Sequence, residues 1–280
     1  MLKRLIVSAD DFGLTKGVNR GIVKAFQEGI VTSASLLSVG QAYDDAISLA
    51  KRNPGLDIGI HLCLTEEKPI LEKEIIPSLT VRSGRFLETH GKFILNYILR
   101  RVDLNDVEKE IDAQIRRIID SGIPLTHMDS HGHIHMLPHI LAVAVKLAKK
   151  YNIRIIRYPR EKISFCDFKW QRYAAFCFLG LACLLTKFNQ EYKRFIKIDY
   201  FFGFFNSGQL SLESVRKILS IFSSGVGELS CHPGEYDAAH QRYNCWKYNW
   251  QRELKALTSN DMKMAIEEAN IELINFRGLV

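Results

Sequence analysis

The chain has 280 residues, of which 47% are hydrophobic, and this is enough apolar sequence to bury the core of one large α/β domain. No Pro/Gly/Ser-rich linker, low-complexity tract or internal repeat divides it, so we expect a single domain over residues 1–280. The net charge of +7 is compatible with anionic partners, but no basic run interleaved with aromatic residues indicates nucleic acid, and we expect none as a partner.

Targeting signals and structural cysteines are also missing from the sequence. Too few apolar residues precede Asp10 to form a signal peptide, so we expect a cytoplasmic protein. The six cysteines show no CxxC spacing, which argues against a disulfide framework and against a thiolate zinc site. The only long apolar stretch, residues 173–185, is shorter than the roughly 20 residues that span a bilayer.

The first part of the chain alternates strand and helix patterns. The apolar run 5–8 leads into Asp10-Asp11-Phe12-Gly13, which predicts a buried strand and then a turn. Thr15 is expected to cap the helix that follows. The elements predicted next, in chain order, are a helix over 18–27, a strand over 34–38, a helix over 43–52 and a strand over 57–62. Strand, helix and strand in this order predict a parallel sheet.

Residues 66–100 break this rhythm. Pro69, Pro77 and the turn-like residues 82–85 predict a long loop inserted over one end of the sheet. The alternation then resumes with a helix over 104–121, a strand over 124–129, a helix over 138–151, and strands over 153–158, 200–204, 226–230 and 271–276. About eight strands predict a (β/α) barrel, TIM-barrel-like and distorted, with an open doubly wound sheet as the alternative architecture.

Acids and histidines follow the strands. In folds built from parallel strands the loops at the carboxyl ends converge on one face, where the chemistry takes place. Each of these residues ends a predicted strand or lies late in one: Asp10, Asp11, His61, Asp129, His131 and His232. Their common position predicts a single site.

The segment from Thr126 to His135 carries a polar residue at every odd position from 127 to 135. While the chain stays extended, these side chains point to one face. Four imidazoles and a carboxylate on one face are difficult to explain as core packing, although a solvated strand edge is the alternative. Imidazole together with carboxylate favours a divalent transition metal or zinc over calcium.

Asp10 and Asp11 are adjacent, and adjacent residues on a strand point to opposite faces. Both carboxylates can reach one centre only if the turn at Phe12-Gly13 rotates the second one; taken alone, the pair is more typical of a turn or a helix cap. If one acid binds a metal, the other can serve as a general base. We interpret His90, His139 and His240 as structural or surface residues.

Four ordered motifs carry a family resemblance. They are Ser8-Ala9-Asp10-Asp11-Phe12-Gly13-Leu14, Gly29-Ile30-Val31-Thr32-Ser33, Gly59-Ile60-His61-Leu62 and Thr126-His127-Met128-Asp129-Ser130-His131. Together with Cys231-His232-Pro233-Gly234 they resemble the YdjC-like carbohydrate deacetylase family over the whole chain. The sequence is most similar to the HpnK branch, associated with hopanoid biosynthesis, because Gly132 stands where the chitooligosaccharide deacetylase branch has histidine.

The resemblance implies a hydrolase that removes the N-acetyl group from an acetylated amino sugar, such as the N-acetylglucosaminyl headgroup of a hopanoid lipid. It implies one divalent metal ion, Mg²⁺ or Zn²⁺, held by Asp11, His61 and His131. Asp10 would then be the general base and His232 the general acid. We expect the remaining polar residues of the 126–135 segment to contact substrate or support the metal ligands; these are Asp129, His133 and His135.

Residues 165–205 combine aromatic and aliphatic residues with a basic cluster, and two interpretations are open. The segment forms either a buried helix and strand of the barrel or an interfacial surface that meets a glycolipid substrate and an anionic membrane. A peripheral membrane location and a homodimer are therefore further expectations.

Two other functions compete with the deacetylase. His133-Ile134-His135 resembles the His-x-His pair of metal-dependent amidohydrolases and phosphoesterases, although there the pair usually ends the first strand. A non-catalytic metal- or sugar-binding module is the second alternative, in which Asp10 would be dispensable.

Overall fold

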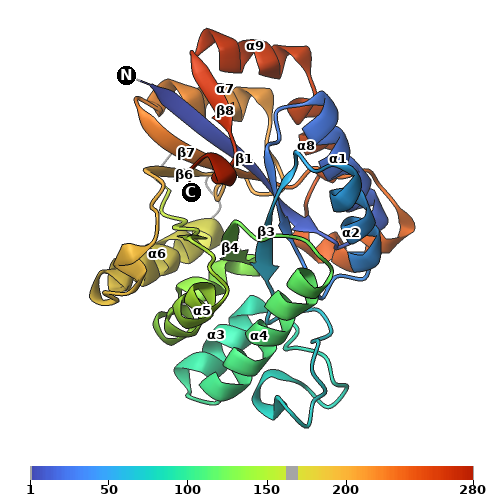
Figure 1. Cartoon of the computed structure of the whole chain (residues 1–280), viewed down its shortest axis with the longest axis vertical. Helices are drawn as coiled ribbons and strands as arrows, with labels where there is room; N and C mark the ends of the chain where they lie inside the picture. The colour runs from blue at the N-terminus through green and yellow to red at the C-terminus, as the bar shows by residue number, and fades with distance from the viewer. Residues whose placement is uncertain (1, 162–169, 280) are drawn as a thin grey trace.

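The computed structural model describes residues 2–161 and 170–279, which form a curled parallel β-sheet flanked by helices (Figure 1). The strands are β1 (Lys3–Phe12), β2 (Ser33–Leu36), β3 (Asp57–Leu62), β4 (His127–Ser130), β5 (Ile155–Ile156), β6 (Tyr200–Phe202), β7 (Gly225–Cys231) and β8 (Ile271–Ile274). The helices are α1 (Lys16–Glu28), α2 (Tyr43–Arg52), α3 (His90–Ile98), α4 (Leu104–Asp120), α5 (Pro138–Lys150), α6 (Trp170–Leu185), α7 (Leu212–Ile221), α8 (Trp250–Leu257) and α9 (Asn260–Glu268).

The sheet order is β5-β4-β3-β2-β1-β7-β6, and every pairing in it is parallel. β8 adds to the first half of β1, whose second half pairs with β2. Isolated bridges, Ile155 to Ile196 and Glu161 to Phe201, join the β5 and β6 sides of the curled sheet. The distorted, TIM-barrel-like α/β fold is therefore confirmed, and the open doubly wound sheet is not observed.

The main core lies between the sheet and its helices and draws on nearly the whole chain, from Leu5 to Ile271. Local signals place the helices as expected: the Thr15 hydroxyl accepts a hydrogen bond from the Val18 amide at the start of α1, and Pro138 is the first residue of α5. Among the described residues, no helix has both the length and the apolar character needed to cross a membrane.

The prediction of an unbroken loop over residues 66–100 is wrong. A short 3-10 helix, η1 (Pro77–Leu79), and α3 both lie inside it. The Thr89 side chain caps α3 by accepting from the Lys92 amide, and Phe93 is fully buried. The turn residues that predicted a loop end at Arg85, so they gave no information on the capped apolar segment that follows.

Residues 165–205 are partly buried and partly exposed, and residues 165–169 lie outside the described part of the chain. Phe201, Phe202 and Phe205 are buried in and after β6. In α6 one face is buried through Leu179, Ala182 and Cys183, but Leu181 and other apolar residues are exposed, so the buried interpretation holds for only part of this helix. Burial could not be inferred from composition because α6 is apolar on most of its circumference.

Helix α1 packs closely against the loop that follows β7. A β-carbon added at Gly21 would lie 2.3 Å from the Gly234 α-carbon, two residues after His232. The absent side chain therefore allows α1 to approach the end of β7 that bears the histidine.

We predict opposite effects for the same substitution in two helices. Gly21→Ala should lower the free energy of unfolding by about 1–3 kcal/mol because the methyl group would collide with backbone. Gly180→Ala in α6 is the matched control, since no atom of the described residues lies within 4 Å of the position its β-carbon would take; it should stabilise the protein by about 0.5–1 kcal/mol. Urea denaturation measures both, and equal effects would contradict the close packing of α1.

Candidate active site

The two acids after Ala9 reach the same site through a β-bulge. Ala9 pairs with Ala34 and Phe12 with Leu36, so Asp10 and Asp11 both lie opposite Ser35. Asp11 has φ of 67°, a left-handed conformation that is uncommon outside glycine. The rotation expected at Phe12-Gly13 therefore takes place at Asp11 itself.

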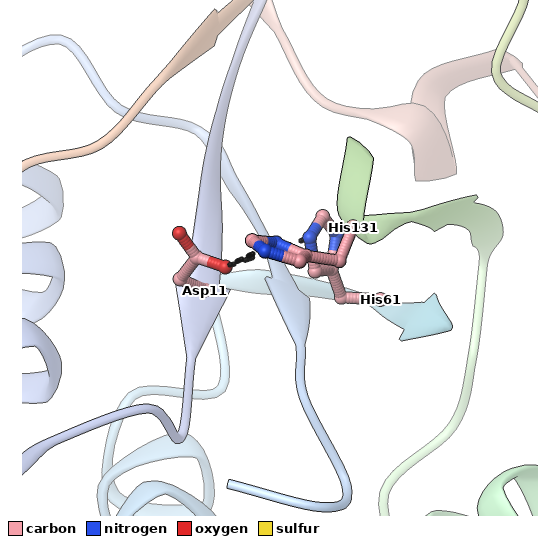
Figure 2. A group of neighbouring side chains, drawn as sticks. All are labelled: Asp11, His61 and His131. Carbon is pink, nitrogen blue, oxygen red and sulfur yellow. Dashed lines mark ion pairs between the residues drawn. The ribbon is translucent and has the colours of Figure 1, made fainter. Parts of the chain in front are cut away.

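Asp11, His61 and His131 converge from β1, β3 and the residue after β4 (Figure 2). One ligand atom from each lies within 4.8 Å of the others. His131 Nδ1 is 3.3 Å and His61 Nε2 is 3.6 Å from Asp11 Oδ1. Asp11 is buried, yet neither carboxylate oxygen accepts a hydrogen bond. A buried carboxylate that accepts no hydrogen bond is costly. One carboxylate and two imidazoles that face each other fit a divalent cation, which would compensate this charge.

Electrostatics support the same conclusion. Burial alone would raise the pKa of Asp11, but the adjacent imidazoles of His131 and His61 hold this pKa below its usual range. Burial would also lower the pKa of His131, but Asp11 and Glu66 raise it to about 10. The two carboxylates around His131 therefore favour a positive charge between them, which a bound cation would also supply.

His61 is oriented by a carboxylate behind it. Its Nδ1 atom lies 2.8 Å from Asp129 Oδ1, which leaves Nε2 directed at Asp11. The other oxygen of Asp129 accepts from the Ser35 hydroxyl at 2.8 Å. A carboxylate on the far nitrogen selects the imidazole tautomer of a metal ligand, so Asp129 supports His61 and does not line the cavity.

His131 has a comparable support that the sequence did not reveal. Its Nε2 atom lies 3.3 Å from Glu66 Oε2. The rings of His90 and Trp246 contact the His131 ring at centroid distances of 4.8 and 4.7 Å. Helix α3 carries His90 onto the cavity wall beside His131, a position that its interpretation as a structural or surface residue did not anticipate.

Glu66, His90 and His131 also lie close enough to form a metal site, as do Asp10, His61 and Asp129. The second of these groups is less suitable, because the Arg157 guanidinium already neutralises both of its carboxylates. The first requires the same His131, through its other nitrogen. The unpartnered oxygens of Asp11 make Asp11, His61 and His131 the best candidate of the three.

Arg157 holds the general-base candidate. Its two Nη atoms contact the two oxygens of Asp10 at 2.7 and 2.8 Å, and Nη1 is also 2.7 Å from Asp129 Oδ2. Nε donates to Glu228 Oε1 at 2.6 Å. The Ser230 hydroxyl donates to Asp10 at 2.9 Å. Asp10 is thus fixed beside the three convergent residues and lines the cavity with His61 and His131.

His232 follows β7 and lines the same cavity as Asp10, His61 and His131. Its backbone amide donates to the Glu253 carboxylate at 2.5 Å, and its ring lies against Tyr248 at 4.7 Å. His232 Nδ1 is buried and has no hydrogen-bond partner among the described residues. It is available to a bound substrate, as proton donation requires.

The expectation that residues 127 to 135 present one polar face is wrong beyond Ser130. β4 ends there, and η2 (His131–Met136) begins with Gly132 and His133 in left-handed conformations. His133 lines the cavity, and its Nδ1 atom has no described partner. His135 is fully buried, with its ring nitrogens 2.6 Å from Ser130 Oγ and 3.0 Å from the Arg157 carbonyl.

These residues surround a cavity of about 600 Å³, which is large enough for a sugar. Its polar lining includes Asp10, His61, His131, His133 and His232, and much of the remainder is apolar. The apolar lining comes from α3, η2, the residue before α5, α6 and the residues after β6, and includes Ile94, Met136, Leu137, Phe178, Leu179 and Phe204.

Sequence reasoning missed Arg157, Glu228, Glu66, Trp246 and Tyr248. Arg157 had a usable signal, because it is a charged residue at the carboxyl end of an apolar predicted strand, as Asp10 is. Glu66 had none, since it lies in a segment predicted to be a loop and reaches His131 only through the folded chain.

Comparison with known proteins gives a consistent result. The family model described as "YdjC-like protein" matches residues 4–268. Proteins named "Carbohydrate deacetylase" from Brevibacillus brevis and Listeria monocytogenes are 34% and 32% identical to this chain, and the matches cover 99% of this chain and 99% and 100% of theirs. A crystal structure from Enterococcus faecalis, named provisionally for cellobiose-phosphate cleavage, matches with a TM-score of 0.77 and 31% identity over 100% of both chains.

The first prediction from the site concerns pH. Burial raises the pKa of Glu228 from 4.5 to about 7, although Arg157 opposes this. A carboxyl with a raised folded-state pKa contributes stability that is present below pH 4.5 and lost as the pH rises through about 7. The unfolding free energy of wild type relative to Glu228→Gln should therefore fall over this window in urea titrations. A difference that does not change with pH would contradict it.

The second prediction concerns Glu66. Glu66→Ala should weaken Zn²⁺ binding about 10–100-fold, because the His131 imidazole loses the acceptor that orients it. Glu66→Gln should weaken binding less, since its amide oxygen can still accept. Glu88→Ala, at an exposed carboxylate near α3, is the matched control. Calorimetric titration of the apoprotein measures affinity without activity, and equal affinities for all four proteins would show that Glu66 does not support His131.

Proposed function

Because this chain belongs to the YdjC-like protein family, we propose that it is a metal-dependent carbohydrate deacetylase that cleaves the N-acetyl group of an acetylated amino sugar. The observation that carries the proposal is the buried, unsatisfied Asp11 carboxylate facing His61 and His131, beside Asp10 on the wall of the same cavity. The proposal treats residues 1–280 as one domain around this site.

In the proposed mechanism Asp11, His61 and His131 hold one divalent cation, Mg²⁺ or Zn²⁺. Bound there, the cation supplies Lewis-acid polarisation of the acetyl carbonyl. Asp10 accepts the proton of the attacking water. Arg157 keeps the Asp10 carboxylate oriented toward the cavity. His232 donates a proton to the sugar nitrogen as the C–N bond breaks, which releases acetate and a free amine.

The other residues of the cavity have supporting roles in this proposal. Tyr248 restricts the His232 ring through an edge-to-face contact. His133 presents an unpartnered ring nitrogen to the cavity and would bind a hydroxyl of the sugar. His135 acts from behind, where it holds Ser130 and the Arg157 carbonyl in place.

The finer proposal is that the chain belongs to the HpnK branch and acts on the N-acetylglucosaminyl headgroup of a hopanoid. Its support lies at position 132. The glycine there has φ of 60°, and an added β-carbon would lie 2.1 Å from the His90 ring. His90 thus fills the space next to His131 that a histidine at position 132 would need. A homodimer is part of the proposal on general grounds, because closed symmetric pairs are common.

The amidohydrolase and phosphoesterase alternative receives less support from the geometry. It requires His133 and His135 to bind one metal together. Both ring nitrogens of His135 are already occupied by Ser130 and the Arg157 carbonyl, and its ring centroid is 6.4 Å from that of His133. A non-catalytic binding module would not need Asp10 held in a defined position beside the cluster.

Acetate release tests the proposed function. Metal-loaded wild type should release acetate from an N-acetylglucosaminyl hopanoid or from diacetylchitobiose. Asp10→Asn should lower the rate about 10²–10⁴-fold while it retains metal, because a general base is lost. His131→Ala should lose both metal and turnover, whereas His139→Ala, on the exposed start of α5, should resemble wild type.

The pattern of substrates separates the coarse proposal from the fine one. Release from the hopanoid alone supports the HpnK branch, and release from diacetylchitobiose alone retains the deacetylase but excludes that branch. Metal-loaded protein that releases acetate from neither, or an Asp10→Asn variant with full activity, would overturn the proposed mechanism.

A further inference from the structure

Two helices at the mouth of the active-site cavity leave apolar faces exposed. In α6 and the turn after it, Phe178, Leu181, Leu185 and Phe188 follow helical spacing, and Leu181 and Phe188 are 56% and 82% exposed. The opposite side of α6 packs on Met136 through Leu179, Ala182 and Cys183. The exposed stripe is therefore additional to the face that attaches α6 to the fold.

Helix α3 has the same character. Leu95, Ile98 and Leu99 are spaced three and four residues apart, so they share one face, and Ile98 is 61% exposed. Phe93 anchors the helix from its other side. The exposed apolar residues of α3 and α6 together form what we term the rim: Leu95, Ile98, Leu99, Phe178, Leu181, Leu185 and Phe188.

The start of α5 links the two parts of the rim. The Tyr97 hydroxyl of α3 lies 2.8 Å from His139 Nδ1. Leu185 and Phe188 line a surface cavity together with Pro138 and Leu141. Figure 1 shows α3, α5 and α6 along the lower part of the molecule, whereas α9 lies at the top. The rim is thus one region and not two scattered patches.

Cations accompany the apolar residues. Arg100 and Arg101 follow α3, and Lys187 lies in the turn after α6; all three are exposed and make no ion pair with another described residue. Lys193 and Arg194 are two further exposed cations after α6. Glu191 lies between α6 and these two residues, and it pairs with Lys149 and with Arg194. Large apolar side chains flanked by unpaired cations are complementary to an anionic lipid surface.

The rim is continuous with the active site. Phe178 is exposed and also lines the cavity, and α3 contributes His90 and Ile94 to the same wall. The cavity is polar around Asp10 and apolar toward α6, at Leu179 for example. An amphipathic molecule could therefore enter with its sugar at the polar end while its hydrocarbon remains covered.

We propose that the rim docks the mouth of the cavity on an anionic lipid bilayer, so that the enzyme receives a lipid-linked acetylated amino sugar directly from the membrane. The docking follows from the exposed apolar stripes and their cations. The acetylated headgroup, by contrast, rests on the proposed function. Phe178 and the apolar cavity wall would cover the first part of the lipid chain as the headgroup reaches Asp10.

Vesicle flotation tests the docking. Wild type should float with phosphatidylcholine vesicles that contain phosphatidylglycerol, bind phosphatidylcholine alone at least 10-fold less, and be released by high salt. The double variant Leu181→Glu/Phe188→Glu, which alters neither the polar site nor the cavity lining, should lose binding by more than 10-fold. Met264→Glu, an exposed position on α9, is the matched control and should bind as wild type does.

Several outcomes overturn the proposal. They are failure of wild type to bind anionic vesicles, unchanged binding of the double variant, and a change from dimer to monomer in light scattering that accounts for the effect of the variant. The last result would assign the rim to a second copy of the chain. Thermal denaturation should show that the double variant remains folded, because both positions are exposed.

Acetate release separates this proposal from the proposed function. Loss of vesicle binding by the double variant, with normal turnover of a water-soluble acetylated sugar, supports docking as a separate property of the rim. Vesicle binding by a wild type that releases no acetate would overturn the deacetylase and the glycolipid substrate while the docking itself stands.

Discussion

A single buried guanidinium organises the carboxyl ends of the strands. Arg157 follows β5 and contacts carboxylates from β1, β4 and β7, namely Asp10, Asp129 and Glu228. It is 2% exposed, and burial would lower its pKa, but the three carboxylates raise the pKa well above the ordinary value. Removal of one partner from such a network leaves uncompensated charge, which typically costs about 3–5 kcal/mol. The position of Asp10, the candidate base, therefore depends on how the strands are brought together in the sheet.

The imidazoles of His61 and His131 are also positioned by buried charged partners, in this case one carboxylate each. Asp129 lies behind His61, and Glu66 lies behind His131, so each ring directs its remaining nitrogen at Asp11. Asp129 also contacts Arg157, which couples the orientation of His61 to that of Asp10. The candidate metal ligand His61 and the candidate base Asp10 are thus parts of one hydrogen-bonded assembly, whereas Glu66 reaches His131 from the segment before α3.

The inserted segment 66–100 and helix α6 give this barrel its particular cavity. They place His90 against His131 and surround the polar end of the cavity with an apolar wall. The same two elements expose apolar faces beside unpaired cations. A cavity that is lined by both polar and apolar residues is suited to an amphipathic ligand, and this connects the proposed glycolipid substrate with the proposed docking of the rim.

The α/β class, the parallel strands and most of the polar site follow from the amino-acid sequence alone. Apolar runs that end in acids or histidines predicted where the polar site lies. They could do so because parallel strands place their carboxyl ends on one face in every fold of this class. The family resemblance then selected Asp11, His61 and His131, which strand parity alone could not choose.

The remaining features depend on tertiary structure. The bulge at Asp11, the end of β4 at Ser130 and the capped helix α3 arise from pairing and burial that local patterns do not record. Glu66 and Arg157 act on residues 65 and 147 positions away, so their roles exist only after the chain folds. Exposure of the α6 stripe likewise depends on which neighbours pack against it, since a helix that is apolar on most sides does not specify its buried face.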